Sequence, residues 1–390
     1  MGPIGRMIKS NVRQYGMVIA LGLIMVLFQV LTGGIMFKPM NVTNLVLQYS
    51  YVLILAIGML LCIVTGNIDL SVGSVAAFIG AVSAVMMINL GFPVPLTIVL
   101  ALAIGAAVGS FHGFFIAFQR MPAFIVTLAG MLIFRGLTMV ILKGQTKAPF
   151  DKSFQSIAAG FLPGDGLRFR GLNLVALAAG ILGFAIVAAA VLYSRRAKAK
   201  HRLEEVPLWA DALRILALGG VVLFLTFEFA GYNGLPLVLL ILVALVLLYS
   251  YVTKRTIAGR HVYAMGGNEK AARLSGVKTE RVLFWVYVNM GVLAALAGLL
   301  VAGRLNAASP KAGTNFELDA IAACFIGGAS ASGGIGSVVG TIVGGFVMAV
   351  LNNGMSIMGV SVDWQQTIKG LVLLLAVWFD VLTKRKPLIR

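Results

Sequence analysis

The residues of this chain whose types and spacing could do chemistry are few, and they do not form an enzyme site. The three histidines, His112, His201 and His261, lie far apart in the sequence and lack the spacing of metal ligands. The chain has no glycine-rich P-loop, no GxSxG nucleophile motif and no HExxH zinc motif. We therefore expect no catalytic residues, no metal site and no bound cofactor. We also expect any ATP hydrolysis to belong to a partner protein.

A short polar stretch could instead dock a partner. GGNEKAARLSGVKTER, at Gly266–Arg281, is charged although apolar segments flank it on both sides. Asn268 is a favourable helix N-cap, Glu269 and Arg273 have the spacing of an ion pair, and Gly276 suits the left-handed residue after a helix end. Because a helix of about two turns is marginal in water, it needs a docking surface. That surface is either a partner protein or the membrane surface.

Two polar, glycine-bearing breaks could form part of a transport pathway. CIVTGNIDLSVGSV (Cys62–Val75) aligns without a gap with FIGGASASGGIGSV (Phe325–Val338), which indicates two related halves. Transporters often carry interrupted segments in corresponding positions near the pathway. Capping of the following helices would also explain Asp69 and Ser71. The pathway or gate candidates are Asn67, Asp69, Ser71, Ser330 and Ser332.

Membrane-spanning helices must position these residues. Of the 390 residues, 60% are hydrophobic and 11% are charged, whereas soluble domains carry about 25% charged residues. Apolar runs of about 18 residues, long enough to cross a hydrocarbon layer of about 30 Å, recur along the chain. We therefore predict an all-α, polytopic membrane protein in which residues 1–390 form a single transmembrane domain. The expected spans, about twelve in number, lie near 16–33, 45–65, 71–89, 94–118, 122–142, 172–193, 215–230, 234–252, 282–302, 317–331, 335–351 and 366–382.

The positions of the charged residues indicate the topology. A net charge of +18 would suit a nucleic-acid partner, but most Lys and Arg residues fall in alternate loops, which is the positive-inside pattern. This pattern predicts that both termini and the loop 253–281 are cytoplasmic, with no nucleic-acid partner. The segment 168–230 is interpreted as an inserted pair of spans, because its removal leaves the downstream topology unchanged; about ten spans then remain. Arg135 is the one charge deep in a span, and we expect it to reach the outer surface beside Lys143.

Five motifs, in order along nearly the whole chain, resemble those of one family. Together they resemble the permease subunits of bacterial ABC importers for monosaccharides, the ribose, xylose and galactose group. The extra spans at 168–230 are similar to the longer, xylose-type branch of that group. The motifs are GNIDLSVGS (Gly66–Ser74), FIVTLAGMLIFRG (Phe124–Gly136), YAMGGNEKAARLSGV (Tyr263–Val277), ELDAIAACFIGG (Glu317–Gly328) and LNNGMSIMGV (Leu351–Val360).

The resemblance implies the transmembrane subunit of an ATP-driven importer. Such a subunit moves a monosaccharide, xylose or a related pentose or hexose, into the cytoplasm by alternating access. The implied partners are ATPase subunits on the cytoplasmic side, an extracytoplasmic sugar-binding protein, a second permease copy and the lipid of the bacterial cytoplasmic (inner) membrane. An ion-coupled secondary transporter of a small polar solute is the alternative.

The resemblance also assigns roles to residues. The loop around Asn268–Gly276 matches the family's coupling helix, which favours ATPase docking over membrane anchoring. A small apolar face at Ala271, Ala272 and Leu274 would then seat in a groove of the ATPase. Asn352 and Asn353 form either a turn or an outer loop that contacts the binding protein. The expected coupling residues are Asn268, Glu269, Ala271, Ala272, Arg273, Leu274, Ser275 and Gly276.

Overall fold

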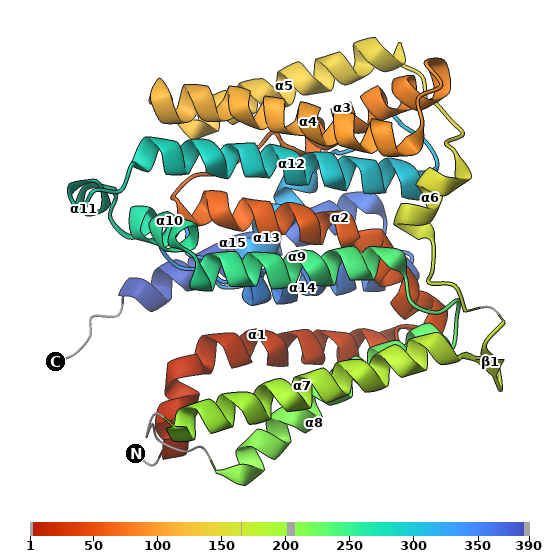
Figure 1. Ribbon diagram of the computed structural model, residues 1–390, viewed down its shortest axis with the longest axis vertical. Helices are drawn as coiled ribbons and strands as arrows, with labels where there is room; N and C mark the ends of the chain where they lie inside the picture. Colours follow the sequence, from red (N-terminus) through yellow and green to blue (C-terminus); the bar gives the residue numbers. More distant parts are fainter. Residues whose placement is uncertain (1–2, 165, 201–206, 386–390) are drawn as a thin grey trace.

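The fold is a bundle of long helices that run side by side (Figure 1). The computed structural model describes residues 3–164, 166–200 and 207–385. Its helical character confirms the predicted all-α class. The elements are α1 (Pro3–Leu31), α2 (Pro39–Val64), α3 (Val72–Ala84), the π-helix η1 (Val85–Asn89), α4 (Val94–Gly113), the π-helix η2 (Phe114–Phe118), α5 (Ala123–Leu142), α6 (Lys152–Ala159), β1 (Arg168–Phe169), β2 (Leu172–Asn173), α7 (Leu174–Lys200), α8 (Leu208–Ala230), α9 (Leu237–Arg255), α10 (Ile257–Gly267), α11 (Glu269–Leu274), α12 (Thr279–Leu305), α13 (Phe316–Ile326), α14 (Val338–Ile357) and α15 (Val362–Arg385).

Nine helices within the described ranges are long and apolar enough to cross a membrane. They are α2, α3 with η1, α4 with η2, α5, α7, α8, α9, α12 and α14. The apolar part of α1 covers Gly16–Leu31, and α15 contains the expected span at 366–382. The expected span at 317–331 differs, because α13 has 11 residues. At about 1.5 Å per residue, α13 is too short to cross a membrane alone.

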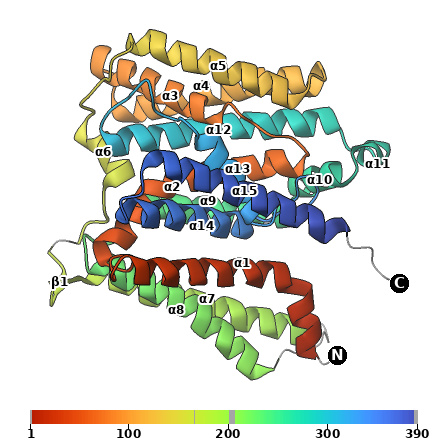
Figure 2. The ribbon, with the colours of Figure 1, turned by 180° about the vertical axis from the view of Figure 1, so that it is seen from behind.

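The two ends of the bundle differ in what they carry. The short helices α10 and α11 project from one end, which we call the α11 end; α6 and the β1–β2 hairpin lie at the opposite end (Figure 1). Helix α1 begins and α15 finishes at the α11 end (Figures 1 and 2). The residues after Arg385 and before Pro3 lie outside the described chain. The described ends of the chain therefore share a side with α11.

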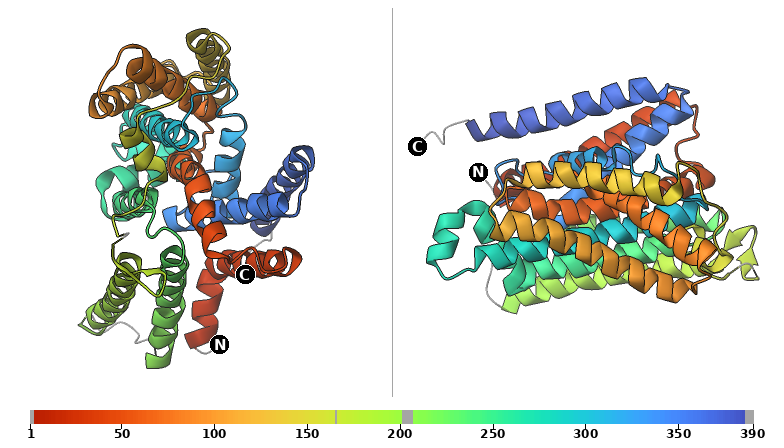
Figure 3. Two further views of the ribbon diagram at one scale, coloured as in Figure 1. Left: turned by 90° about the vertical axis from the view of Figure 1, so that its right-hand side faces the viewer. Right: turned by 90° about the horizontal axis from the view of Figure 1, so that it is seen from above.

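Helix α2 occupies the centre of the bundle. It is apolar on nearly every side and buried along almost its whole length, as expected for a helix without a polar face. It packs against α9, α12, α13 and α14. Helix α15 lies outside these central helices and runs along one flank of the bundle (Figures 2 and 3).

Helices α3 and α13 both begin inside the bundle, and their first turns meet. A Cβ atom on Gly73 would overlap the carbonyl oxygen of Gly313, three residues before α13. From this contact α3 runs toward the opposite end, beside Gly298 and Ala302 of α12. Helix α13 runs toward the α11 end, where Gly327 packs on Gly340 in α14. The irregular segments 65–71 and 306–315 bring the chain into the bundle from opposite ends, as in transporters with discontinuous helices.

The segment predicted as an insertion forms a helical hairpin at the edge of the bundle (Figure 3). Helices α7 and α8 pack on each other, and the Arg195 guanidinium lies 2.8 Å from the Asp211 carboxylate. The ring of Phe224 in α8 contacts the ring of Phe37, with 5.6 Å between centroids. This peripheral position is compatible with an insertion, which stays a prediction.

Candidate functional site

Helix α11 has the local features that the sequence predicted. The Asn268 Oδ1 atom accepts a hydrogen bond from the Ala271 amide at 3.0 Å, which satisfies a free N–H group at the helix start. The Arg273 guanidinium lies 3.3 Å from the Glu269 carboxylate. Gly276 has a φ angle of 88°, which glycine adopts without strain. The last helical residue is Leu274, and Ser275 follows as the C-cap.

The apolar face expected on α11 is divided between two directions. Ala272 is 6% exposed, because it packs against the chain's own neighbouring helices. Leu274 is 91% exposed, and Ala271 is also exposed. The prediction that Ala272 belongs to an open docking face is therefore wrong. The apolar group offered to a partner is the Leu274 side chain, with Ala271 beside it in sequence.

Polar contacts that the sequence analysis missed attach α11 to the rest of the protein. The Arg273 guanidinium lies 2.8 Å from the Glu280 carboxylate and donates to the Thr279 hydroxyl at 3.1 Å. Glu280 also pairs with Arg120, which lies between α4 and α5, at 3.5 Å. The sequence feature that could have predicted these contacts was the presence of charged residues close to a short capped helix. These bonds connect α11 to the start of α12 and to the loop before α5.

The first break has a buried hydrogen-bonded centre. The Asp69 carboxylate accepts from the Ser71 amide at 2.8 Å and from the Ser71 hydroxyl at 2.6 Å. The Ser71 hydroxyl also lies 3.5 Å from Nδ1 of His112 in α4. Both Asp69 bonds go to Ser71, the residue before α3, and Ser71 itself makes no side-chain cap bond to α3. The Asn67 amide bonds within the break, to the Thr65 carbonyl at 3.1 Å.

The second break contains both candidate serines. The hydroxyls of Ser330 and Ser332 lie 2.9 Å apart, and the Ser332 amide donates to the Ser330 hydroxyl at 3.2 Å. Ser330 is fully buried, whereas Ser332 is exposed. The two breaks touch each other, because the Gly334 amide donates to the Val64 carbonyl at 2.8 Å. The contact is made by backbone atoms, and the five candidate side chains stay in two separate groups.

Asn352 and Asn353 do not lie in an outer loop or a turn. Both belong to α14, and they are 4% and 8% exposed. The Asn353 amide forms a reciprocal pair with the Asn41 amide of α2, with two hydrogen bonds of 3.0 Å. The expected contact with a binding protein is therefore wrong for these side chains. The Asn353 side chain holds α14 against α2.

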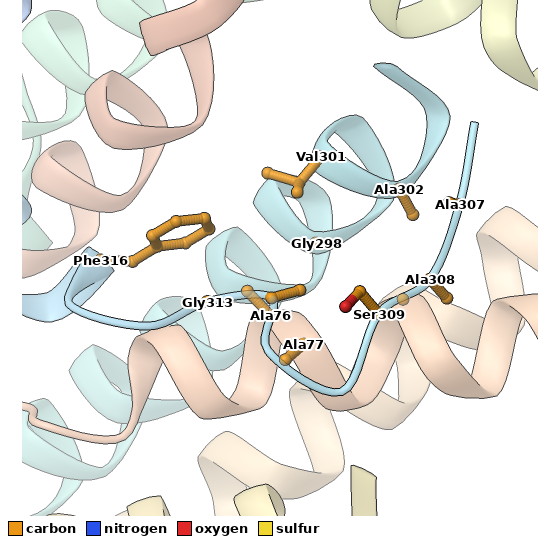
Figure 4. A pocket seen from close by; sticks show the side chains of 12 residues that line it. Ala76, Ala77, Gly298, Val301, Ala302, Ala307, Ala308, Ser309, Gly313 and Phe316 are labelled. Carbon is orange, nitrogen blue, oxygen red and sulfur yellow. The ribbon is translucent and has the colours of Figure 1, made fainter. Parts of the chain in front are cut away.

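A cavity of about 280 Å³ lies toward the opposite end of the bundle. The Tyr51 and Phe316 rings stack beside it with 4.1 Å between centroids, and Gln48, Arg304 and Thr314 contribute polar groups to its lining. The adjoining pocket, of about 10 Å³, is closed by small side chains. Figure 4 shows Ala76, Ala77, Gly298, Ala302 and Ala308 around this narrow part, with Phe316 at its side.

The segment 306–315, which contributes to the lining of both pockets, is held from both sides. The amide and carbonyl of Ala308 bond to Lys147 at 2.9 Å and 3.0 Å. The Arg135 guanidinium donates to the Ala312 carbonyl at 2.8 Å and to the Thr314 hydroxyl at 3.3 Å. Arg135 therefore bonds to the segment 306–315, whereas the sequence analysis expected it to reach the outer surface beside Lys143.

Comparison with known proteins assigns the chain to a family. A family model described as branched-chain amino acid transport system / permease component matches residues 41–377. The xylose transport system permease protein of Haemophilus influenzae is 41% identical over 376 residues, which cover 96% of this chain and 98% of that protein. Its counterpart in Escherichia coli is 40% identical over 386 residues, covering 96% of this chain and 93% of that protein.

A ribose permease is also similar. The ribose import permease protein of Escherichia coli is 35% identical over 340 residues, covering 87% of this chain and 85% of that protein. No solved structure gives a significant match. The resemblance to sugar permeases that the five motifs predicted is thus confirmed. The chain belongs to the family of transport-system permease components, together with the xylose and ribose permeases.

Proposed function

We propose that this chain is the transmembrane subunit of an ATP-driven importer that passes a monosaccharide inward by alternating access. The observation that carries the proposal is the match to xylose permeases over 96% of the chain. Xylose or a related pentose or hexose is the proposed solute. The chain works in a bacterial cytoplasmic membrane, with the α11 end and both termini in the cytoplasm.

Helix α11 supports ATPase docking. Its capped start and its bonds to α12 hold it in place, and it presents the exposed Leu274 side chain away from the bundle. An exposed leucine on a fixed helix suits a groove in a partner protein. The ATPase subunits therefore bind at the α11 end, a sugar-binding protein delivers the solute at the opposite end, and a second permease copy completes the assembly.

The cavity near Tyr51 supports a sugar route. Its volume of about 280 Å³ is suitable for one small solute, and ring faces with a few polar groups are a common lining of ligand pockets. The C–H face of a sugar ring can pack on Tyr51 and Phe316, while Gln48 and Arg304 bond to its hydroxyls. The narrow neighbouring pocket then acts as the closed part of the route.

One observation favours an ion-coupled carrier instead. An ion pair joins the buried Asp319 of α13 to the half-buried Lys369 of α15, and ionisable residues inside membrane proteins often serve ion transport. An ion-coupled carrier would use the same cavity near Tyr51 for its solute but would need no ATPase.

Transport in proteoliposomes separates the two candidates. The permease is reconstituted with the ATPase and the binding protein, and uptake of labelled xylose is measured with ATP, without ATP, and with a proton or sodium gradient alone. Uptake that requires ATP supports the importer. Uptake by the permease alone under an ion gradient contradicts it.

A further inference from the structure

The two breaks and the end of α10 meet at one point beside α11. The Gly334 amide of the second break donates to the Val64 carbonyl, at the end of α2, at 2.8 Å. Gly266, in the last turn of α10, packs directly on this hydrogen bond. We call Val64, Gly266 and Gly334 the junction. It brings together the end of α10, which leads into α11, and both of the breaks aligned in the sequence.

Gly266 leaves no room for a side chain. A Cβ atom there would overlap the Val64 carbonyl oxygen and lie 2.8 Å from the Gly334 nitrogen. Both neighbours are backbone atoms that already bond to each other, so they cannot turn aside as a flexible side chain would. Gly267, the next residue, has nothing within 4 Å of the same position. Of these two adjacent glycines, Gly266 must therefore be glycine, whereas Gly267 has room for a side chain.

A second bond connects α10 to the second break. The Tyr263 hydroxyl, one turn before Gly267, donates to the Gly336 carbonyl at 2.9 Å. Burial raises the pKa of Tyr263, so the phenol keeps the proton that it donates. Helix α10 is thus attached to the second break by a side chain and by backbone contact.

Asn268 makes α10 and α11 continuous. Its amide donates to the Ala264 carbonyl at 3.1 Å, which completes the last turn of α10. Its side chain accepts from the Ala271 amide at 3.0 Å, which caps the first turn of α11. One residue thus belongs to the bonding of both helices. A displacement of α11 would be passed to α10 without a flexible linker.

We infer that the junction is the mechanical link between α11 and the two breaks, with Gly266 and Tyr263 as positioning residues. The inference rests on the proposed function, in which an ATPase moves α11. The first break leads into α3, and the second joins α13 to α14. Because α3 and α13 meet at Gly73, one displacement at the junction reaches both helices that begin inside the bundle.

The test is a matched pair of substitutions, Gly266→Ala and Gly267→Ala, in the reconstituted complex of permease, ATPase and binding protein. Three quantities are measured: binding of the ATPase, the rate of ATP hydrolysis and xylose uptake. We expect Gly266→Ala to keep ATPase binding and hydrolysis while uptake per ATP falls at least tenfold. Gly267→Ala should match the natural sequence in all three. Equal uptake per ATP in the two variants overturns the inference.

A milder variant covers the case in which Gly266→Ala does not assemble. Tyr263→Phe removes only the bond to Gly336 and keeps the ring, so we expect uptake per ATP to fall at least twofold with unchanged ATPase binding. An unchanged ratio overturns the inference. Failure of the proposed function looks different, because the natural sequence itself then shows no ATP-dependent uptake.

Discussion

The buried Asp319 carboxylate and the half-buried Lys369 ammonium lie 3.0 Å apart. Asp319 belongs to α13, which is too short to cross a membrane, and Lys369 belongs to α15 on the flank of the bundle. The carboxylate side chain is 9% exposed and the lysine side chain 24%. The pair therefore fastens α15, on the flank, to a helix that begins inside the bundle.

Loss of one partner of this pair should destabilise the fold. Lys369→Met leaves the buried Asp319 carboxylate without its partner, which typically costs about 3–5 kcal/mol, and Asp319→Asn leaves the half-buried Lys369 ammonium unpaired. We expect each single variant to melt at a lower temperature in detergent than the natural sequence. The double variant Asp319→Asn/Lys369→Met should recover part of the loss, because it leaves no unpaired charge. Single variants that melt at the natural temperature would show that the pair adds nothing to stability.

Leu274 should decide ATPase binding at α11. Full burial of a leucine side chain is worth about 1.5–3 kcal/mol, so Leu274→Asp should weaken ATPase binding at least tenfold. Leu274→Met keeps apolar volume and is the control with near-natural affinity. The measurement is a titration of the ATPase against the permease in detergent. Equal affinity for Leu274→Asp and Leu274→Met would place the docking surface elsewhere.

The amide pair of Asn41 and Asn353 should matter for the stability of the fold and not for delivery of the sugar by the binding protein. Asn353→Ala removes both hydrogen bonds that join the part-buried Asn41 amide to α14, a loss of about 1–3 kcal/mol. We expect a lower melting temperature together with unchanged affinity for the sugar-binding protein. A changed affinity with an unchanged melting temperature would favour the outer-loop role that the sequence suggested.

The Tyr51 ring should matter for sugar passage. With Tyr51→Ala, the apparent KM for xylose uptake should rise about tenfold, equal to about 1.4 kcal/mol, because the ring face is lost. Tyr51→Phe keeps that face, so its apparent KM should stay within about twofold of the natural value. That change is well under the roughly 1.4 kcal/mol of a tenfold effect. ATP hydrolysis without sugar reports whether the complex is intact. An unchanged KM for Tyr51→Ala would remove this cavity from the route.

Local features were predictable from the sequence, whereas partners from distant segments were not. The cap at Asn268 and the pair of Glu269 with Arg273 depend on residues three and four positions apart, so the order of residue types was sufficient. Asn353 was misplaced because two asparagines before a glycine also suit a turn. Its actual partner, Asn41, lies 312 residues away.

The direction in which Ala272 points also depended on the tertiary structure. The sequence shows a small residue on a short helix, but the neighbouring helices decide which side is covered. The same limit explains why the contact of Gly73 with Gly313 was missed. The alignment of the two breaks identified corresponding polar segments. Gly73 lies in the first of these segments, but Gly313 lies outside the second.

The meeting of α3 and α13 places two helix starts deep in the protein. Each helix start leaves N–H groups without an intrahelical partner, and here two starts share one place near Gly73. The Gly313 carbonyl and the Glu317 carboxylate lie against Gly73, so acceptors that lipid chains cannot supply are already present there. A side chain at either Gly73 or Gly313 would therefore force the two helix starts apart.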